Sequence, residues 1–184
     1  LSYFTTSLGL NLVVVTADSD GQYFHMAQLT SNIGNANQQN KLHISANEAM
    51  NLDDIRTGGL IDYRMWVERA LSEELGIVEV ESDHASEKII EDVIFLECSM
   101  EMTNYEPYLS GVVFLNIDSE RLNMLMKSNA RDARREITKL HRFPYTRAGI
   151  MDVLINSENG SAGFTTYSLN ILNMIIEKNM LDIT

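Results

Sequence analysis

Hydrophobic and polar residues follow two different patterns along this chain of 184 residues. Up to about residue 118, short runs rich in β-branched and aromatic residues are separated by Gly, Asn and Asp, which is typical of strands and turns. The predicted strands are 10–17, 22–28, 41–46, 93–97 and 108–117. Because the stretch 18–21 reads Asp-Ser-Asp-Gly, the first two strands are expected to form a hairpin.

The most regular pattern in the chain is a helical one at 62–75. Its apolar positions are Tyr63, Trp66, Val67, Ala70, Leu71 and Leu75. Asp62 can cap the first turn, and Gly76 can end the helix in the left-handed conformation. We expect this helix to lie against one face of the sheet and to bury Trp66 and Leu71.

After Asp118 the pattern turns helical, with helices predicted at 119–140, 146–156 and 165–180. The last of these carries an apolar stripe that is too large to be left in water. The stripe consists of Ile171, Leu172, Ile175 and Ile176. The chain is therefore predicted to be a single α/β domain, 1–184, in which a mixed sheet packs between helices. Residues 1–118 supply the sheet and the 62–75 helix, and residues 119–184 form a helical extension packed on it.

The charge balance narrows the choice of partners. Fourteen basic and 26 acidic residues give a net charge of −12, which opposes a nucleic-acid partner and favours divalent cations. No apolar run is long enough to span a membrane, so a membrane partner is not expected. The single cysteine, Cys98, lies in an apolar run and is expected to be buried and inert, and the cytoplasm is the expected compartment. Because the sequence begins at Leu1 rather than at a methionine, other domains of a longer chain are expected partners. The alternative expectation is a second copy of the chain in a homodimer.

Two adjacent carboxylates, Glu73 and Glu74, stand in the last turn of the 62–75 helix. At about 100° per residue, Glu74 falls inside the apolar stripe and Glu73 at its edge, where Arg69 can pair with it from four residues earlier. A carboxylate directed toward a core needs a partner, and a metal ion is one. A side chain that bends out to water is the other interpretation, and geometry alone leaves both open.

The run "RALSEELGI" at 69–77 resembles the Nudix box. The core pattern of that family is Arg-Glu, an aliphatic residue, any residue, Glu-Glu, any residue, Gly and an aliphatic residue. The matching residues are Arg69, Leu71, Glu73, Glu74, Gly76 and Ile77. Ala70 stands where the family has a metal-binding glutamate. The usual glycine pair and third glutamate before the arginine are replaced by "ANEAM" and an insertion at 51–62. The resemblance extends over about 8–117 and implies a Nudix-like α/β/α sandwich.

This resemblance implies a site and a chemistry. Nudix proteins hold Mg²⁺ or Mn²⁺ against the diphosphate of a nucleoside diphosphate linked to another moiety, and water attacks a phosphorus. Glu73 and Glu74 are implied as metal ligands and catalytic residues, with Arg69 orienting them. Because Ala70 leaves one ligand missing, Glu48 is the preferred replacement. Further candidates, whose ordinary interpretation is a solvated surface carboxylate, are Glu97, Glu101 and Glu106.

Two other groups of residues could contact a ligand. His25 and His43 on predicted strands could orient a phosphate or act as a base, although a hydrogen-bonded structural role is the favoured interpretation. A basic helix is predicted at 130–142. In one interpretation its basic face binds an acidic partner or the phosphates of a ligand. In the favoured interpretation its side chains lie in water and pair with nearby acidic residues. Its cations are Arg131, Arg134, Arg135, Lys139 and Arg142.

The sequence therefore supports two hypotheses of different classes. The preferred one is a Nudix-like domain that binds a nucleotide-type small molecule, with a divalent metal and with impaired catalysis. The alternative is an active Mg²⁺- or Mn²⁺-dependent pyrophosphohydrolase of a nucleotide-type diphosphate.

Overall fold

The structure is a computed structural model, and it describes residues 8–31, 39–78, 88–101, 105–130, 137–157 and 163–182. The strands are β1 (Gly9–Asp18), β2 (Gly21–Leu29), β3 (Leu42–Ile44), β4 (Ala46–Ala49), β5 (Ile90–Glu101), β6 (Glu106–Leu115) and β7 (Ile137–Pro144). The helices are α1 (Tyr63–Leu75), α2 (Ser119–Asn129), α4 (Arg147–Ser157) and α5 (Thr166–Glu177), with short 3₁₀ turns η1 (Leu52–Asp54) and η2 (Met180–Asp182). Within the described ranges, no helix is long and apolar enough to cross a membrane.

The strands form one mixed seven-stranded sheet, whose main path is β3-β2-β1-β6-β5. β1 and β6 are parallel at its centre, whereas β1–β2 and β5–β6 are antiparallel pairs. β3 pairs with β2 and β4 pairs with β1, so the chain crosses from one strand to the other at Ser45. The hydroxyl of Ser45 donates to the carbonyl oxygen of His25 and accepts from the amide of Val14 at 3.2 Å. The strand predicted at 41–46 is therefore two short strands with a break between them.

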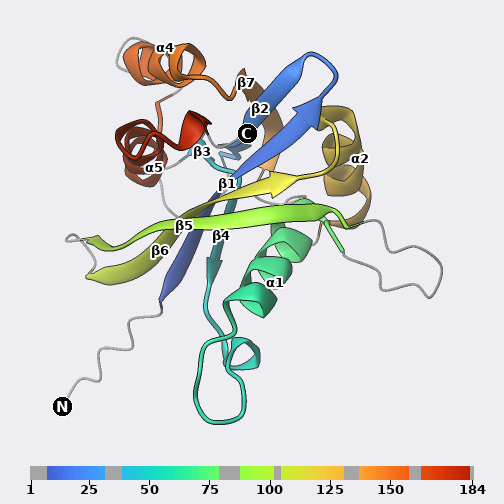
Figure 1. The fold of residues 1–184 in the computed structure, drawn as a ribbon, viewed down its shortest axis with the longest axis vertical. Helices are drawn as coiled ribbons and strands as arrows, with labels where there is room; N and C mark the ends of the chain where they lie inside the picture. Colours follow the sequence, from blue (N-terminus) through green and yellow to red (C-terminus); the bar gives the residue numbers. More distant parts are fainter. Residues whose placement is uncertain are drawn as a thin grey trace.

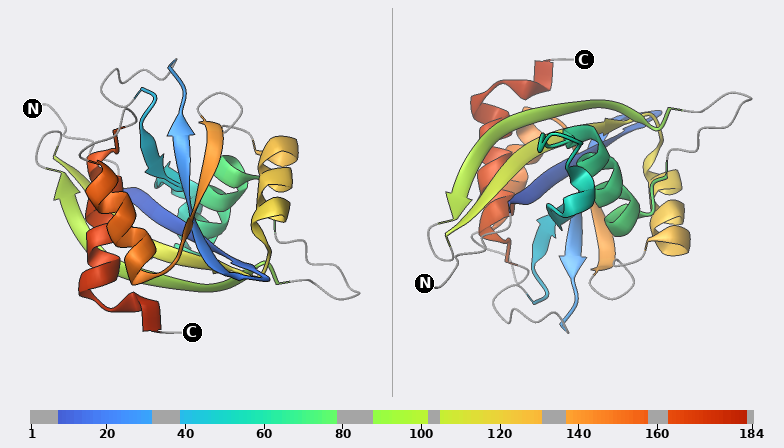
Figure 2. Two further views of the ribbon diagram at one scale, coloured as in Figure 1. Left: turned by 90° about the horizontal axis from the view of Figure 1, so that it is seen from above. Right: turned by 90° about the horizontal axis from the view of Figure 1, so that it is seen from below.

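Helices cover both faces of this sheet (Figures 1 and 2), with α1 and α2 on one face and α4 and α5 on the other. Alternate residues of β1 point to opposite faces, as the period of a strand requires. Leu12 and Val14 pack with α1 in one core cluster, and Val13 and Val15 pack with α5 in the other. The predicted α/β sandwich with a mixed sheet is confirmed, and the apolar stripe of α5 contributes to the second core cluster.

Helix α1 forms as its local sequence predicts. The carboxylate of Asp62 accepts from the amide of Met65 at 3.2 Å, and Gly76 ends the helix with a φ of 69°. Trp66 and Leu71 are both 0% exposed. Because the caps and the apolar stripe agree, both ends of this helix and its buried face were predictable.

The helix predicted at 119–140 extends too far: residues 137–140 lie in a strand, and residues 131–136 lie outside the described part of the structure. α2 ends at Asn129, and β7 is a strand that pairs antiparallel with β2. Ile137 and Leu140 are three residues apart, a spacing that also suits a helix, but both lie on this strand, in which Leu140 and Phe143 point to opposite faces. Each of them packs in a different core cluster, and the ring of Phe143 stacks on Phe24 with centroids 5.3 Å apart. The part of the chain after Asp118 therefore contributes a strand as well as helices.

The expectation of a buried Cys98 is also wrong, because its side chain is exposed. Cys98 lies on β5, which ends the path of strands at one side of the sheet. The neighbouring residues Glu97 and Met100 are exposed as well. An apolar run predicts a strand, but it does not reveal which strand lies at the edge of a sheet.

Candidate functional site

Three carboxylates from three different elements converge on the guanidinium of Arg69, which projects from α1. Arg69 Nη1 lies 3.0 Å from Oε1 of Glu48 on β4 and 3.6 Å from Oε2 of Glu73 on α1. Arg69 Nη2 and Nε lie 2.7 and 3.1 Å from the two carboxylate oxygens of Asp54 in η1. Nη2 also donates to the carbonyl oxygen of Ala49 at 2.7 Å. We call Arg69, Glu48, Asp54 and Glu73 the Arg69 cluster.

The Arg69 cluster is largely shielded from solvent. The exposed fraction of the side chain is 17% for Arg69, 18% for Glu48 and Glu73, and 2% for Asp54. One positive charge faces three negative ones, and the two parallel bonds to Asp54 have the bidentate geometry of a strong pair. The hydrogen bond to Asp54, followed by that to Glu48, raises the pKa of Arg69 above its ordinary value, although burial acts against the charged form.

The insertion at 51–62 brings Asp54 to this place through its own hydrogen bonds. The side chain of Asn51 accepts from the amide of Asp53 at 2.7 Å, and Asp54 Oδ2 accepts from the amide of Asn51 at 2.8 Å. The amide of Asp62, which caps α1, donates to the carbonyl oxygen of Asp54 at 2.7 Å. Sequence reasoning missed Asp54. The Asn-x-x-Asp spacing of a capping box at 51–54 was the available signal for an ordered turn there.

The structure brings two of the three proposed metal ligands, Glu48 and Glu73, to Arg69, and it places Glu74 half-buried in the same last turn of α1. Ala70 is 0% exposed and belongs to the core cluster between the sheet and α1. Among the residues that the structure describes, no three His, Cys, Asp or Glu side chains are arranged to hold a metal ion. The guanidinium of Arg69 lies where the carboxylates meet. These side chains, as they are arranged, do not fit a divalent ion.

The other candidate carboxylates lie elsewhere. Glu97 on β5 is exposed and accepts a hydrogen bond from the hydroxyl of Ser99, and Glu106 is exposed at the start of β6. Glu101 ends β5, and its side chain lies outside the described part of the structure. Of the four carboxylates considered as replacements for the missing ligand, Glu48 is therefore the one that the described structure brings to the helix.

Both candidate histidines are buried, and each is hydrogen-bonded through a ring nitrogen, while Nδ1 of His25 has no partner among the described residues. His25 Nε2 lies 2.9 Å from the hydroxyl oxygen of Thr16, and His43 Nδ1 lies 2.7 Å from that of Thr165. Burial lowers the pKa of each histidine to about 4. Both imidazoles are therefore neutral near pH 7, in agreement with the structural interpretation.

The part of the basic run that the structure describes, which carries Lys139 and Arg142, is a strand and not the predicted helix. Arg131, Arg134 and Arg135 lie outside the described residues, whereas Lys139 and Arg142 are on strand β7. Arg142 forms an ion pair with Asp18, lies 3.9 Å from a carboxylate oxygen of Asp20, and stands 3.8 Å above the ring of Tyr23. Pairing with nearby acids, the favoured interpretation, describes this residue.

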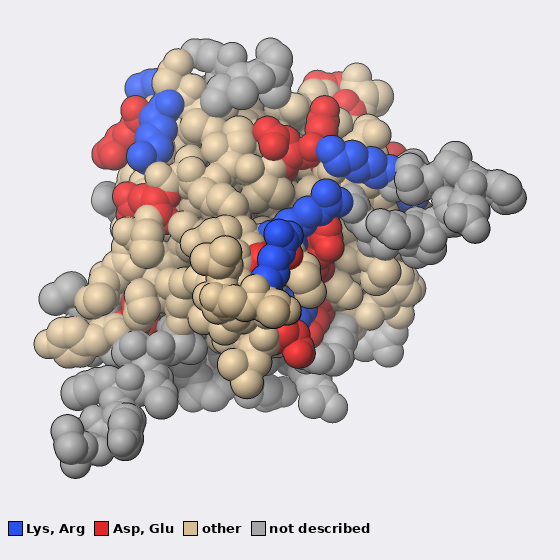
Figure 3. Space-filling model, turned by 60° about the horizontal axis from the view of Figure 1, so that its bottom comes forward, with Lys and Arg blue, Asp and Glu red and all other residues tan. Residues whose placement is uncertain are grey.

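Two hollows lie beside α1. One, of about 350 Å³, lies between α1 and β5, and the other, of about 300 Å³, lies over Glu68, Arg69 and Ser72 and is bordered by Ile77 and Val78. On the face of the molecule that Figure 3 shows, basic and acidic side chains lie next to one another. The hollow between α1 and β5 has a mostly apolar lining, whereas charged, polar and apolar side chains together line the other, and in each hollow basic side chains are accompanied by acidic ones.

No family model and no curated protein sequence matches this chain. Solved structures do match it. The Nudix domain of Shewanella oneidensis NrtR, in complex with ADP ribose, is 12% identical, with a TM-score of 0.57 over 96% of this chain and 90% of that one. A MutT/Nudix family protein from Listeria innocua is 11% identical, with a TM-score of 0.53 over 95% and 94% of the two chains. A hydrolase of ADP compounds is 15% identical, with a TM-score of 0.55 over 96% and 75%. The chain has the fold of these proteins.

Proposed function

We propose that this Nudix-fold chain binds a small molecule of the nucleoside-diphosphate type and hydrolyses it poorly or not at all. The observation that carries the proposal is that Arg69 pairs with Glu73, which the resemblance implies as a metal ligand, and with Glu48, the expected replacement for the missing ligand. The ligand class is supported by proteins of the same fold, one of which is in complex with ADP ribose and another of which is a hydrolase of ADP compounds.

The reason for impaired hydrolysis is a competition between two cations. A diphosphate carries several negative charges, and its hydrolysis in this fold relies on divalent ions held by several oxygen ligands. A Mg²⁺ or Mn²⁺ ion bound by Glu73, Glu74 and Glu48 has to displace Arg69 from two of these carboxylates. Ala70 supplies no oxygen in return. We therefore expect weak metal binding at these residues.

The alternative function is an active Mg²⁺- or Mn²⁺-dependent pyrophosphohydrolase, and it requires the metal ion to displace Arg69 from the carboxylates. In this case Glu73 and Glu74 are the catalytic residues, and Arg69 orients them. The two functions differ in what happens to a bound ligand. They are therefore separated by measuring binding and turnover on the same protein under the same conditions.

The experiment is a calorimetric titration combined with an assay of product release. The wild-type protein is titrated with ADP-ribose, nucleoside-diphosphate sugars, dinucleotides and nucleoside triphosphates, each with and without Mn²⁺. We expect binding of at least one diphosphate and little or no product. Failure of every ligand to bind at millimolar concentration would overturn the proposal.

If turnover appears, variants of Glu73 and Glu74 show whether these residues are responsible for it. If product forms with Mn²⁺ and is lost in Glu73→Gln and Glu74→Gln, the alternative function is correct. The matched control is Glu97→Gln, which removes an exposed carboxylate on β5 and is expected to leave both binding and turnover unchanged.

A further inference from the structure

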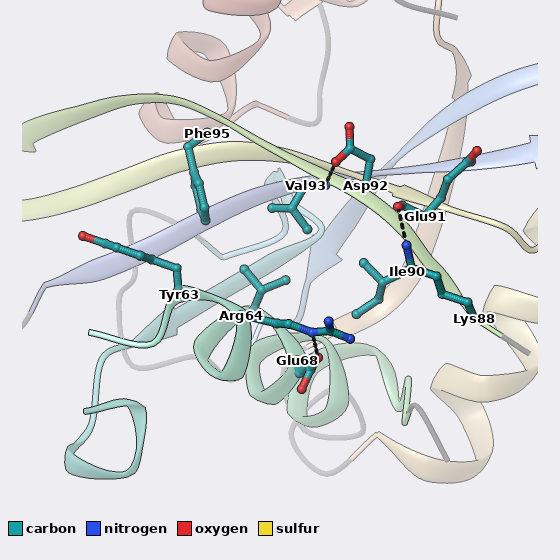
Figure 4. A pocket seen from close by; sticks show the side chains of 10 residues that line it. Tyr63, Arg64, Glu68, Lys88, Ile90, Glu91, Asp92, Val93 and Phe95 are labelled. Carbon is teal, nitrogen blue, oxygen red and sulfur yellow. Dashed lines mark hydrogen bonds and ion pairs between the residues drawn. The ribbon is translucent and has the colours of Figure 1, made fainter. Parts of the chain in front are cut away.

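A pocket of about 350 Å³ lies between α1 and β5, and Figure 4 shows that side chains from both elements form its walls. The helix contributes Tyr63, Arg64, Val67 and Glu68, and the strand contributes Ile90, Val93 and Phe95. At about 100° per residue, Arg64 lies about 140° around the helix axis from Arg69. The pocket and the Arg69 cluster are therefore on different sides of α1, and neither the carboxylate cluster nor a metal is needed to form the pocket.

The floor of the pocket is apolar and rigid. Val67 is 2% exposed and Ile90 is 9% exposed, and both belong to the core cluster between the sheet and α1. Val93 packs against the same cluster. A ligand that reaches this floor meets side chains that are already fixed by the core, so binding does not have to order them.

Two aromatic rings stand at one end of the pocket. Tyr63 is 46% exposed and Phe95 is 38% exposed, although both are large apolar side chains. Their ring centroids are 5.6 Å apart, and the rings are tilted by 58°. Because the rings are tilted, a flat ligand can stack on the face of one of them and contact the edge of the other, and the apolar area that it removes from water contributes favourably to binding.

A polar pair stands on the helix side of the same pocket. Arg64 Nε lies 2.6 Å from Oε1 of Glu68, and the two side chains are 73% and 36% exposed. Together they present hydrogen-bond donors and acceptors side by side. The acidic side chains of Glu91 and Asp92 point away from the pocket in Figure 4, so its polar lining consists of the Arg64–Glu68 pair and Lys88, whose ammonium group donates to the carbonyl oxygen of Glu91 at 3.1 Å.

These features favour a ring with apolar faces and a polar edge. An aliphatic ligand leaves the hydrogen-bonding groups of Arg64, Glu68 and Lys88 unused, whereas a neutral polar edge can use their donors and acceptors alike. A heteroaromatic base matches both parts, because its faces pack on the aromatic rings and the floor while its edge exchanges hydrogen bonds with the pair. The volume lies near the lower end of the range of small-molecule pockets, roughly 300–1,000 Å³.

We propose that the pocket between α1 and β5 binds the heteroaromatic base of a nucleoside. The choice of a nucleoside among planar ligands rests on the proposed function. The binding itself uses Tyr63 and Phe95 as the stacking surface and the Arg64–Glu68 pair as the hydrogen-bonding edge.

The test is a titration with adenosine, guanosine, cytidine and uridine, each in the presence of EDTA. We expect at least one nucleoside to bind, and Tyr63→Ala and Phe95→Ala each to weaken it about tenfold, since stacking of a base on an aromatic ring contributes roughly 1–3 kcal/mol. Tyr63→Phe keeps the ring and is expected to keep the affinity. Tyr105→Ala removes an aromatic side chain that is 56% exposed and does not line the pocket, and it is expected to change nothing.

The outcomes separate this inference from the proposed function. The proposal that this pocket binds a base is contradicted if no nucleoside binds at millimolar concentration. It is also contradicted if neither Tyr63→Ala nor Phe95→Ala weakens the binding. If ADP-ribose binds equally well to wild type and both variants, the pocket is overturned and the proposed function stands. If a nucleoside binds in EDTA and no diphosphate binds, the pocket stands and the proposed function is overturned. Thermal melts of each variant confirm that the domain remains folded.

Discussion

Arg69 and Asp54 show how single residues define the candidate site. Asp54 is buried, and its two carboxylate oxygens both accept hydrogen bonds from the guanidinium of Arg69. Because Asp54 also accepts from the amide of Asn51, one side chain connects the insertion at 51–62 to α1. The pairing of Arg69 with Glu73 was expected from their four-residue spacing, but it is the longest ion pair in the cluster, at 3.6 Å.

Asp54→Ala is expected to lower the free energy of unfolding by about 3 kcal/mol, because it removes one partner of a buried ion pair. Urea unfolding of wild type and variant measures the change. Arg64→Ala is the control, since it breaks an ion pair on the same helix whose side chains are 73% and 36% exposed, and it is expected to cost less than about 0.5 kcal/mol. Equal losses in the two variants would contradict the structural importance of the Arg69 cluster.

Ala70→Glu restores the carboxylate of the Nudix pattern at a position that is now 0% exposed. Without metal we expect it to lower the melting temperature, because a buried carboxylate without a partner costs several kcal/mol. Added Mn²⁺ is expected to raise the melting temperature of this variant by mass action. Ala70→Gln has a similar shape and no charge, so it is expected to lose stability without responding to Mn²⁺. A shared response to Mn²⁺, or none in either variant, would show that position 70 no longer faces a cation site.

At the scale of elements, the end of α1 is fitted closely to α2. Gly76 has a φ of 69°, and a Cβ atom there would lie 2.6 Å from the carbonyl oxygen of Leu125 and 2.7 Å from the amide nitrogen of Ala130. The glycine therefore serves two purposes. It ends α1 in the left-handed conformation, and its lack of a side chain allows the backbone of α2 to approach.

Gly76→Ala is expected to lower the free energy of unfolding by about 3 kcal/mol, which combines the backbone penalty of the left-handed conformation with overpacking against α2. Gly59→Ala isolates the first contribution, because Gly59 has a φ of 80° and nothing lies within 4 Å of the added Cβ atom. We expect this control to lose only about 1 kcal/mol. Thermal and denaturant melts of the two variants give the difference, and a loss in Gly76→Ala no greater than in Gly59→Ala would exclude the close contact.

At the scale of the whole molecule, two buried histidines lie where the sheet meets other elements. His25 on β2 contacts Thr16 on β1 and lies 3.4 Å from the hydroxyl oxygen of Ser119 at the start of α2. His43 on β3 contacts Thr165, the cap of α5. Burial lowers the pKa of both to about 4, while Asp18 acts in the opposite direction on His25 and Arg142 reinforces the effect. The stability of the fold is therefore coupled to pH.

We expect the free energy of unfolding to decrease as pH falls from about 6.5 to about 4. In this range the unfolded chain, whose histidines have a pKa of about 6.5, binds protons that the folded chain does not bind, and this favours unfolding. Each histidine contributes up to about 3 kcal/mol across the range. Urea unfolding at a series of pH values measures the slope, and His25→Gln and His43→Gln should each reduce it. An unchanged slope in both variants would show that other groups govern the pH dependence.

The sequence by itself determined the elements whose causes are local. Helix α1 was predicted with both of its caps and with Trp66 and Leu71 buried, because Asp62, Gly76 and the apolar stripe act within a few turns of one helix. Tyr63, the first residue of the predicted stripe, is nevertheless 46% exposed. The ion pair between Arg69 and Glu73 was predictable for the same reason, because the two residues are four positions apart on one helix. The match of 69–77 to a known pattern also indicated the fold.

Only the tertiary structure decided the features that depend on distant parts of the chain. Residues 137–144 became a strand because pairing with β2 and contact with both core clusters outweigh an apolar spacing that resembles a helix. Cys98 became exposed because β5 lies at the end of the main strand path. Asp54 reached Arg69 through the fold of an insertion, and this contact decided that the carboxylates meet around a guanidinium. In each case the physical reason is the same: burial and charge pairing depend on which elements meet in space, and local sequence does not encode that.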